Sequence, residues 1–143
     1  MKILVDTSAA LRYASAEDSK HDLVVKCVLE LLEANHELIF TPQVERESWA
    51  VMTRPRESNG FGLTVSEAKG LMHSIENVMV LLEDVPEVHQ LWRDLVERYD
   101  VKGKQVHDAN HVAAMLAHDI DEVLTLDERD FRRYHEIRIR LPQ

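Results

Sequence analysis

The chain has 143 residues, of which 45% are hydrophobic and 30% are charged, with only four Gly and four Pro. This composition excludes collagen-like, low-complexity and disordered chains, and it predicts a single globular domain over residues 1–143. The formal net charge of −9 argues against a general nucleic-acid-binding protein, because such proteins usually carry a basic field that attracts phosphate.

Short apolar runs alternate along the chain with segments of helical periodicity. The runs predict strands at residues 3–5, 38–40, 78–82, 123–126 and 137–141. Between them, the periodicity predicts helices that start after Asp6, at Ser19, after Pro42, at Thr64, at Val88 and near His107, with one short helix before the last strand. Short buried strands separated by helices are typical of an α/β fold with a mostly parallel sheet of four or five strands, covered on both faces.

One long turn-rich segment interrupts this pattern at residues 54–62. It is followed by Thr64-Val65-Ser66-Glu67, which has the form of a capping box, so that a surface loop is expected to lead into a capped helix.

Cysteine use and hydropathy indicate the compartment. The single Cys27 cannot form an internal disulfide or a Cys-based zinc cluster, which suits a reducing environment. No apolar run approaches the roughly 20 residues that cross a bilayer, and Asp6 interrupts the first run too early for a signal-peptide core. We expect a cytoplasmic protein with no membrane partner.

Carboxylates occupy positions where such a fold would bring them together. Sites of parallel α/β sheets lie beyond the carboxyl ends of the strands, and two predicted strands run directly into Asp6 and Asp127. Either residue alone is equally well explained as a turn or helix-capping residue. Glu47 and Asp108 each share a helical face with apolar residues, which directs both carboxylates toward the core. For Asp108, the simpler interpretation is that it complements the helix dipole.

If these four acids converge, their mutual repulsion has a chemical consequence. At a spacing of about 5 Å and an effective dielectric of about 20, each ionised pair repels by roughly 3 kcal/mol. Either several acids stay protonated or a divalent cation neutralises them, and oxygen-only ligands favour Mg²⁺ or Mn²⁺ over zinc. A metal held by carboxylates suits phosphodiester hydrolysis, so the sequence indicates a nuclease.

The chain resembles the PIN-domain ribonucleases, especially the VapC-type toxins of bacterial and archaeal toxin–antitoxin pairs. The resemblance spans the whole chain and rests on Asp6–Ala9, Thr41–Gln43 with Glu47 and Thr53–Pro55, Asn59–Leu63, Val106–Ala109, and Leu124–Asp127 with Asp130 and Phe131. It implies a PIN-like three-layer fold and a Mg²⁺-dependent endoribonuclease that cleaves RNA, expected to be tRNA or rRNA. It further implies a small antitoxin as partner and a homodimer.

The same resemblance assigns the metal and catalytic residues. It implies Asp6, Glu47, Asp108 and an acid after the fourth strand, which is Asp127 as the nearer residue or Asp130. Asp130 could instead pair with a neighbouring arginine. Glu47 would bind the metal, directly or through water, or act as general base on the attacking water. Thr7 or Ser8 would orient the cluster through its hydroxyl group.

Basic residues are unevenly distributed along the chain, and three of them are candidates for contact with RNA. Arg12 follows the first motif, Arg54 lies in the turn-rich segment, and Arg129 belongs to a group of arginines near the C-terminus. A surface ion pair or an antitoxin contact explains any one of them equally well. Trp49 and Trp92 lie within helical patterns and are expected to pack rather than to stack on bases.

Other functions remain open alongside the toxin. An orphan PIN nuclease would have much the same sequence. His107 and His111 have the i, i+4 spacing of two zinc ligands, but neither an HExxH motif nor a cysteine cluster accompanies them. A strand-terminal Asp6 beside a hydroxyl residue also fits a phosphatase with an aspartyl-phosphate, although the DxD pattern is missing. A non-catalytic metal-binding or interaction module is disfavoured by Glu47, which faces its own core.

Overall fold

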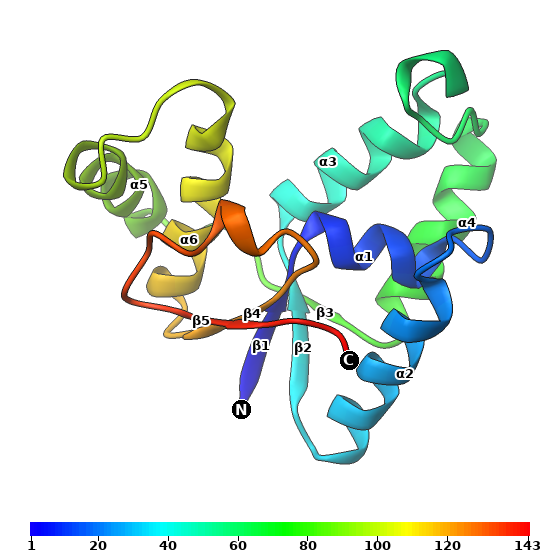
Figure 1. Cartoon of the computed structure of the whole chain (residues 1–143), viewed down its shortest axis with the longest axis horizontal. Helices are drawn as coiled ribbons and strands as arrows, with labels where there is room; N and C mark the ends of the chain where they lie inside the picture. The colour runs from blue at the N-terminus through cyan, green and yellow to red at the C-terminus, as the bar shows by residue number, and fades with distance from the viewer.

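The computed structural model describes all residues, 1–143, and consists of a five-stranded sheet with helices on both faces (Figure 1). In chain order the elements are β1 (Lys2–Val5), α1 (Thr7–Ala14), α2 (His21–Glu33), β2 (Glu37–Phe40), α3 (Pro42–Thr53), the 3-10 turn η1 (Arg56–Ser58), α4 (Val65–Glu76), β3 (Val80–Leu81), α5 (Glu87–Arg98), η2 (Gly103–Gln105), α6 (Val106–Ala117), β4 (Glu122–Leu124), η3 (Glu128–Asp130) and β5 (Arg138–Arg140). None of the helices combines the length and hydropathy needed to span a membrane.

The sheet confirms the predicted α/β architecture. Its strand order is β3-β2-β1-β4-β5, and all four pairings are parallel. From β1 the chain first adds β2 and β3 on one side and later β4 and β5 on the other, so the strand order reverses between β1 and β4. Open α/β sheets bind their ligands at such a reversal, beyond the carboxyl ends of the strands.

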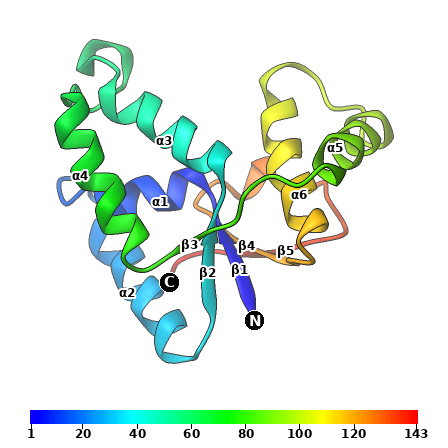
Figure 2. The same ribbon diagram turned by 180° about the vertical axis from the view of Figure 1, so that it is seen from behind.

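Strand alternation divides the interior into two cores. Ile3 and Val5 of β1 face one core, and Leu4 between them faces the other. Helices α1 to α4 cover the first face and α5 and α6 cover the second, which gives the three layers seen edge-on in Figures 1 and 2. All three side chains are fully buried, as expected for the central strand of a parallel sheet.

Three predicted strands end or begin at other residues in the structure, and the run at residues 137–141 forms β5 only over Arg138–Arg140. The run at residues 78–82 forms only the edge strand β3, and its Val80 and Leu81 are 45% and 41% exposed. The run at residues 123–126 leaves the strand after Leu124. The Thr125 N–H still donates to the Arg140 carbonyl at 3.1 Å, but the next two backbone N–H groups donate to side chains, that of Leu126 to Ser8 Oγ at 3.1 Å and that of Asp127 to Thr125 Oγ1 at 2.9 Å. Asp127 therefore does not follow directly on a strand, whereas Asp6 does.

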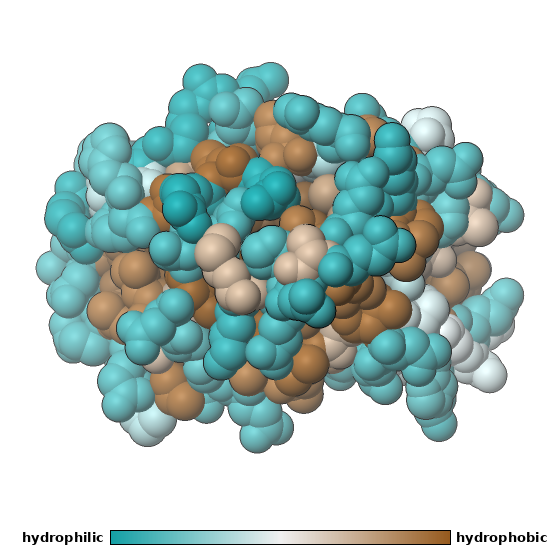
Figure 3. Space-filling model, turned by 90° about the horizontal axis from the view of Figure 1, so that it is seen from below, coloured by the Kyte–Doolittle hydropathy of each residue, from teal (hydrophilic) through white to brown (hydrophobic).

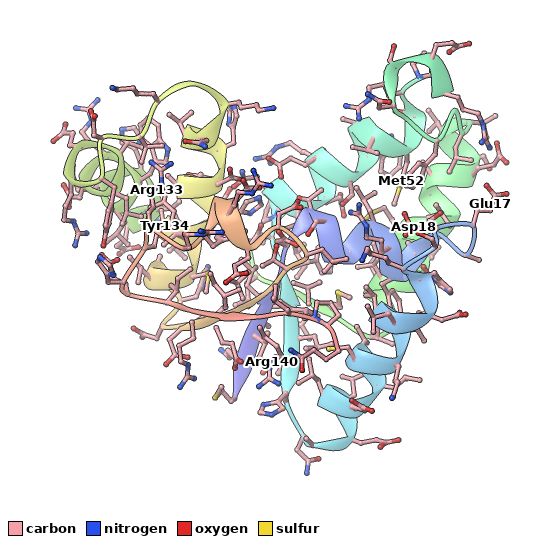
Figure 4. All side chains as sticks on the ribbon, in the orientation of Figure 1. Glu17, Asp18, Met52, Arg133, Tyr134 and Arg140 are labelled. Carbon is pink, nitrogen blue, oxygen red and sulfur yellow. The ribbon has the colours of Figure 1, made fainter.

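The C-terminal segment forms the edge strand of the sheet next to β4 (Figure 4). The short helix predicted before the last strand is the single 3-10 turn η3. Tyr134 is buried in the second core beside α6, and Arg140 on β5 donates from Nε to Glu122 Oε1 of the neighbouring strand at 2.8 Å.

Figure 3 shows the end of the molecule at which the strands begin, opposite their carboxyl ends. Apolar side chains are interspersed with polar ones on this face. Scattered exposed apolar residues are ordinary on globular proteins. The clustered acids lie at the other end, where the strands point.

Candidate active site

Asp6 links the two strands that flank the strand-order reversal. It follows β1 as the N-cap of α1, and its Oδ1 accepts hydrogen bonds from the Ala9 N–H at 3.0 Å and the Ser8 hydroxyl at 2.7 Å. Its Oδ2 accepts from the hydroxyl of Thr125, just after β4, at 2.7 Å. Burial raises the pKa of Asp6 although these donors oppose the shift. Asp6 therefore caps α1, as the capping interpretation predicts, and it also lies at the strand-order reversal between β1 and β4.

The Glu47 side chain, which projects from α3, accepts hydrogen bonds from three donors. Its Oε1 accepts from the Thr7 hydroxyl at 2.7 Å and from His111 Nε2 at 2.9 Å, and its Oε2 accepts from Gln43 Nε2 at 3.1 Å. Burial works to raise the pKa of Glu47, but His111, Thr7 and Gln43 together lower it to about 2. The carboxylate is thus ionised and fixed in orientation.

Asp108 differs from both because no hydrogen bond stabilises its charge. It lies in the first turn of α6 and is half-buried. Burial, followed by repulsion from Asp130 and then from Glu47 and Asp6, raises the pKa of Asp108 to about 7, although His111 opposes the shift. Asp130, Glu47 and Asp6 therefore all lie close enough to Asp108 to repel its charge.

The two candidates for the last acid occupy different surroundings. Asp130, in η3, is half-buried, and its pKa is raised by burial and then by the charge of Asp127. Asp127 is exposed, and its backbone N–H donates to Thr125 Oγ1 at 2.9 Å. Repulsion from Asp130 is second only to burial among the causes that act on Asp108.

The carboxylates of this site are oxygen donors, the ligand type that Mg²⁺ prefers. No three His, Cys, Asp or Glu side chains are close enough in this arrangement to form a ready-made metal site. The chemistry nevertheless fits Mg²⁺, which is usually held by one or two carboxylates and keeps several waters. The carboxylates of Asp108, Asp127 and Asp130 accept no hydrogen bond, and Asp127 is the exposed one of the three, while Asp6 and Glu47 already accept hydrogen bonds and would reach a cation through water.

The predicted arginines are placed differently from one another. Arg12 is engaged within the protein, since Nη1 donates to Ser8 O at 3.0 Å and Nε lies 3.8 Å from Asp18. Arg129 is exposed near Asp130. Arg54 ends α3 and lines a groove beside Glu47.

Three residues at the site were not singled out as part of it by sequence reasoning: His111, Gln43 and Thr125. The i, i+4 pair of His107 and His111 is not held together, because His111 is 2% exposed and bonded to Glu47 whereas His107 is exposed. A polar residue on the otherwise apolar stripe of α6 was the available signal. The partners of Gln43 and Thr125 are up to 119 residues away, so no local pattern marks them.

The chain matches a known protein family in sequence. The sequence profile of the PIN domain matches residues 3–137. No curated protein matches the chain by sequence.

Solved structures resemble the whole chain in fold. VapBC2 from Rickettsia felis, bound to a DNA fragment from its promoter, has a TM-score of 0.73 at 12% identity, covering 99% of this chain and 98% of the other. DNA-bound VapBC from Salmonella typhimurium has a TM-score of 0.72 at 13% identity over 100% and 99%. VapC20 from Mycobacterium tuberculosis, a toxin that cleaves the sarcin-ricin loop, has a TM-score of 0.67 at 18% identity over 95% and 98%. At these identities the likeness establishes the fold alone.

Proposed function

Because the chain belongs to the PIN domain family, we propose that it is a divalent-metal-dependent endoribonuclease, the toxin of a VapC-type toxin–antitoxin pair in the cytoplasm. The observation that carries this proposal is the half-buried Asp108, whose charge has no hydrogen-bond donor and is opposed by three other carboxylates. A cation would relieve this repulsion, and phosphodiester hydrolysis uses one. The M. tuberculosis neighbour is described as cleaving the sarcin-ricin loop, which supports RNA as the substrate; we propose tRNA or rRNA.

Each acid takes a role that follows from its surroundings. We assign the direct metal contacts to Asp108 and Asp130, with Asp6 held nearby by Ser8 and Thr125. Bound Mg²⁺ or Mn²⁺ would lower the pKa of a coordinated water and stabilise charge on the leaving oxygen. The exposed Asp127 adds negative charge beside Asp130.

Glu47 serves in this proposal to orient the attacking water. With a pKa of about 2 it is a weak general base at neutral pH, so the first of its two predicted roles, direct or water-mediated contact with the metal, is favoured. Thr7, Gln43 and His111 act as positioning residues because they fix its carboxylate.

An antitoxin and a homodimer complete the proposal. The Rickettsia and Salmonella neighbours are VapBC assemblies on DNA, which supports a cognate antitoxin that covers the acid site or inserts a basic side chain among the acids. A small DNA-binding protein encoded immediately upstream of this chain would favour the toxin over an orphan nuclease.

The test is cleavage of structured RNA by purified protein in Mg²⁺, Mn²⁺ or EDTA. We expect cleavage only with metal, and a loss of at least about 100-fold in Asp108→Asn and Asp6→Asn, because each variant removes a charge that the cation needs. Asp119→Asn is the matched control, since Asp119 is exposed at the far end of α6 with φ +56°, a conformation that Asn tolerates.

Circular dichroism checks that the variants are folded. Full activity in both Asp108→Asn and Asp6→Asn would reject the assignment. Hydrolysis of p-nitrophenyl phosphate in place of RNA would indicate the phosphatase, and no activity on either substrate would indicate the interaction module.

A further inference from the structure

A groove of about 880 Å³ lies beside the acid site, between α3 and α6. We call it the α3–α6 groove; its lining includes Arg46 and Ala50 of α3, Arg54 directly after α3, Trp92 of α5, and Asn110 of α6, with Glu47 at the acid site. We propose that the groove binds the single-stranded RNA segment on one side of the scissile phosphate, with Arg46 and Arg54 on phosphates and Trp92 against a base. This inference rests on the proposed function.

Helical periodicity gives α3 two distinct faces. Val44, Ser48 and Met52, spaced by four residues, are buried in or beside the first core. Arg46 and Arg54 lie on another face, eight residues or about 12 Å apart along the helix axis. Glu47 lies at the boundary between the two faces, so a ligand that follows the exposed face reaches the acid site at its N-terminal end.

The positive charge of this groove is not neutralised within the protein. Arg46 is exposed and takes part in no ion pair, and the guanidinium of Arg54 donates only to the Asn59 carbonyl, at 3.1 Å. The one acid in the lining, Glu47, is already bound by His111. A chain with net charge −9 therefore presents a locally basic surface next to its candidate active site, as phosphate binding requires.

The hollow on the other side of the acid site has the opposite character. This space of about 560 Å³ next to η3 is lined by three acids against two arginines, Arg129 and Arg132. Its net negative charge repels a phosphate backbone when no cation is bound. Because the α3–α6 groove is basic and the space next to η3 is acidic, we place the RNA segment in the α3–α6 groove.

Fixed polar groups and an aromatic wall suit unpaired bases. Gln43 donates to the His107 carbonyl at 2.8 Å and accepts from Asn110 Nδ2 at 2.8 Å, which ties α3 to α6 across the groove. The Oδ1 of Asn110 has no partner in the protein and can accept from a base. Trp92 packs on the second core and its indole N–H donates to Val106 O at 2.8 Å, so its ring is held rigidly in the groove wall. Single-stranded nucleic acid stacks on such aromatic side chains, whereas paired bases are hidden.

The first test measures binding without cleavage. Fluorescein-labelled oligouridylate of 12 nucleotides is titrated in EDTA at several KCl concentrations and followed by anisotropy. In Arg46→Gln/Arg54→Gln, we expect the slope of log affinity against log salt to decrease in magnitude by about 1.4, since each phosphate contact on a single strand contributes about 0.7. Lys69→Gln/Arg93→Gln removes two exposed cations outside the groove and should leave the slope unchanged.

Tryptophan emission gives an independent readout. Oligouridylate should quench the emission of the wild type but not that of Trp92→Phe, in which Trp49 alone remains. A duplex of the same length should not produce the quenching. Thermal melting establishes that each variant is folded.

The inference would be overturned if the slope of log affinity against log salt in Arg46→Gln/Arg54→Gln equalled that of the wild type. It would also be overturned if the slope changed equally in Lys69→Gln/Arg93→Gln. If the wild type still cleaves RNA in Mg²⁺ under that outcome, the proposed function stands and only the groove is rejected; a wild type that neither binds nor cleaves rejects both. Displacement of oligouridylate by an equal concentration of a 12-residue polyglutamate peptide would identify an acidic protein segment as the ligand and would also overturn the inference.

Discussion

Glu47 and Asp108 show how surroundings set the properties of two carboxyl groups in one site. Three donors lower the pKa of Glu47 to about 2, whereas burial and neighbouring acids raise the pKa of Asp108 to about 7, opposed only by the charge of His111. One group is a fixed charge at any physiological pH. The other changes its charge near neutrality, and it is the group that gains most from a nearby cation.

Asp108 should destabilise the metal-free protein as the pH rises. Its pKa is 3.8 in the unfolded reference and about 7 in the fold, so the folded state loses relative stability between these values, and the penalty is complete above pH 7. In EDTA, we expect Asp108→Asn to melt at a higher temperature than the wild type at pH 8 and at the same temperature near pH 3.5. Thermal melting followed by circular dichroism measures the difference.

Asp119→Asn serves as the control for this prediction and should follow the wild type at both pH values. A melting-temperature difference for Asp108→Asn that is the same at pH 3.5 and pH 8 would show that burial and repulsion do not act on Asp108 as described.

At the scale of elements, the loop after α3 completes that helix. The last carbonyl groups of α3 lack helical partners, and the loop supplies them: Phe61 N–H donates to Val51 O at 2.9 Å and Leu63 N–H to Met52 O at 2.9 Å. Gly60 makes this return possible, because a Cβ at that position would lie 2.0 Å from the Arg54 carbonyl oxygen. The loop thereby also fixes Arg54 at the groove.

Gly60→Ala should therefore destabilise the fold and weaken RNA binding together. We expect a loss of about 1–3 kcal/mol in the free energy of unfolding by urea, because the backbone must move to relieve the clash, and weaker binding of oligouridylate. Gly70→Ala is the matched control: nothing lies within 4 Å of its Cβ position in the interior of α4, so a gain of about 0.5–1 kcal/mol is expected. Unchanged stability in Gly60→Ala would contradict the packing of this loop.

At the scale of the molecule, two cores share one sheet. Trp49 packs against the first core and Trp92 against the second, and residues of β1 contribute to both. We propose that residues 1–143 fold as a single domain, because neither core can lose its helices without exposing β1 and β4.

Single-tryptophan variants test this cooperativity. Trp49→Phe reports on the second core and Trp92→Phe on the first, and within each variant the urea curve from fluorescence should superimpose on that from circular dichroism. Two separated midpoints in either variant would mean that the two sides of the sheet unfold independently.

Local sequence signals predict most of the helices and strands, the parallel α/β class and the family. Periodicity of apolar residues and the capping box at Thr64 and Glu67 are local signals, and the box forms as predicted, with both hydrogen bonds present. Asp6 was found for the same reason, since it directly follows the buried β1.

The assembly of the site depends on contacts between distant segments of the chain. Glu47 is bound by His111 across 64 residues and Asp6 by Thr125 across 119, contacts that exist only because β4 pairs with β1 and α6 packs beside α3. The tertiary structure also places Asp130 rather than Asp127 as the first repulsive neighbour of Asp108, because the η3 turn, not distance along the chain from the strand, sets their positions. Local patterns specify which face of an element is buried, but distances between side chains on different elements follow from strand order and packing.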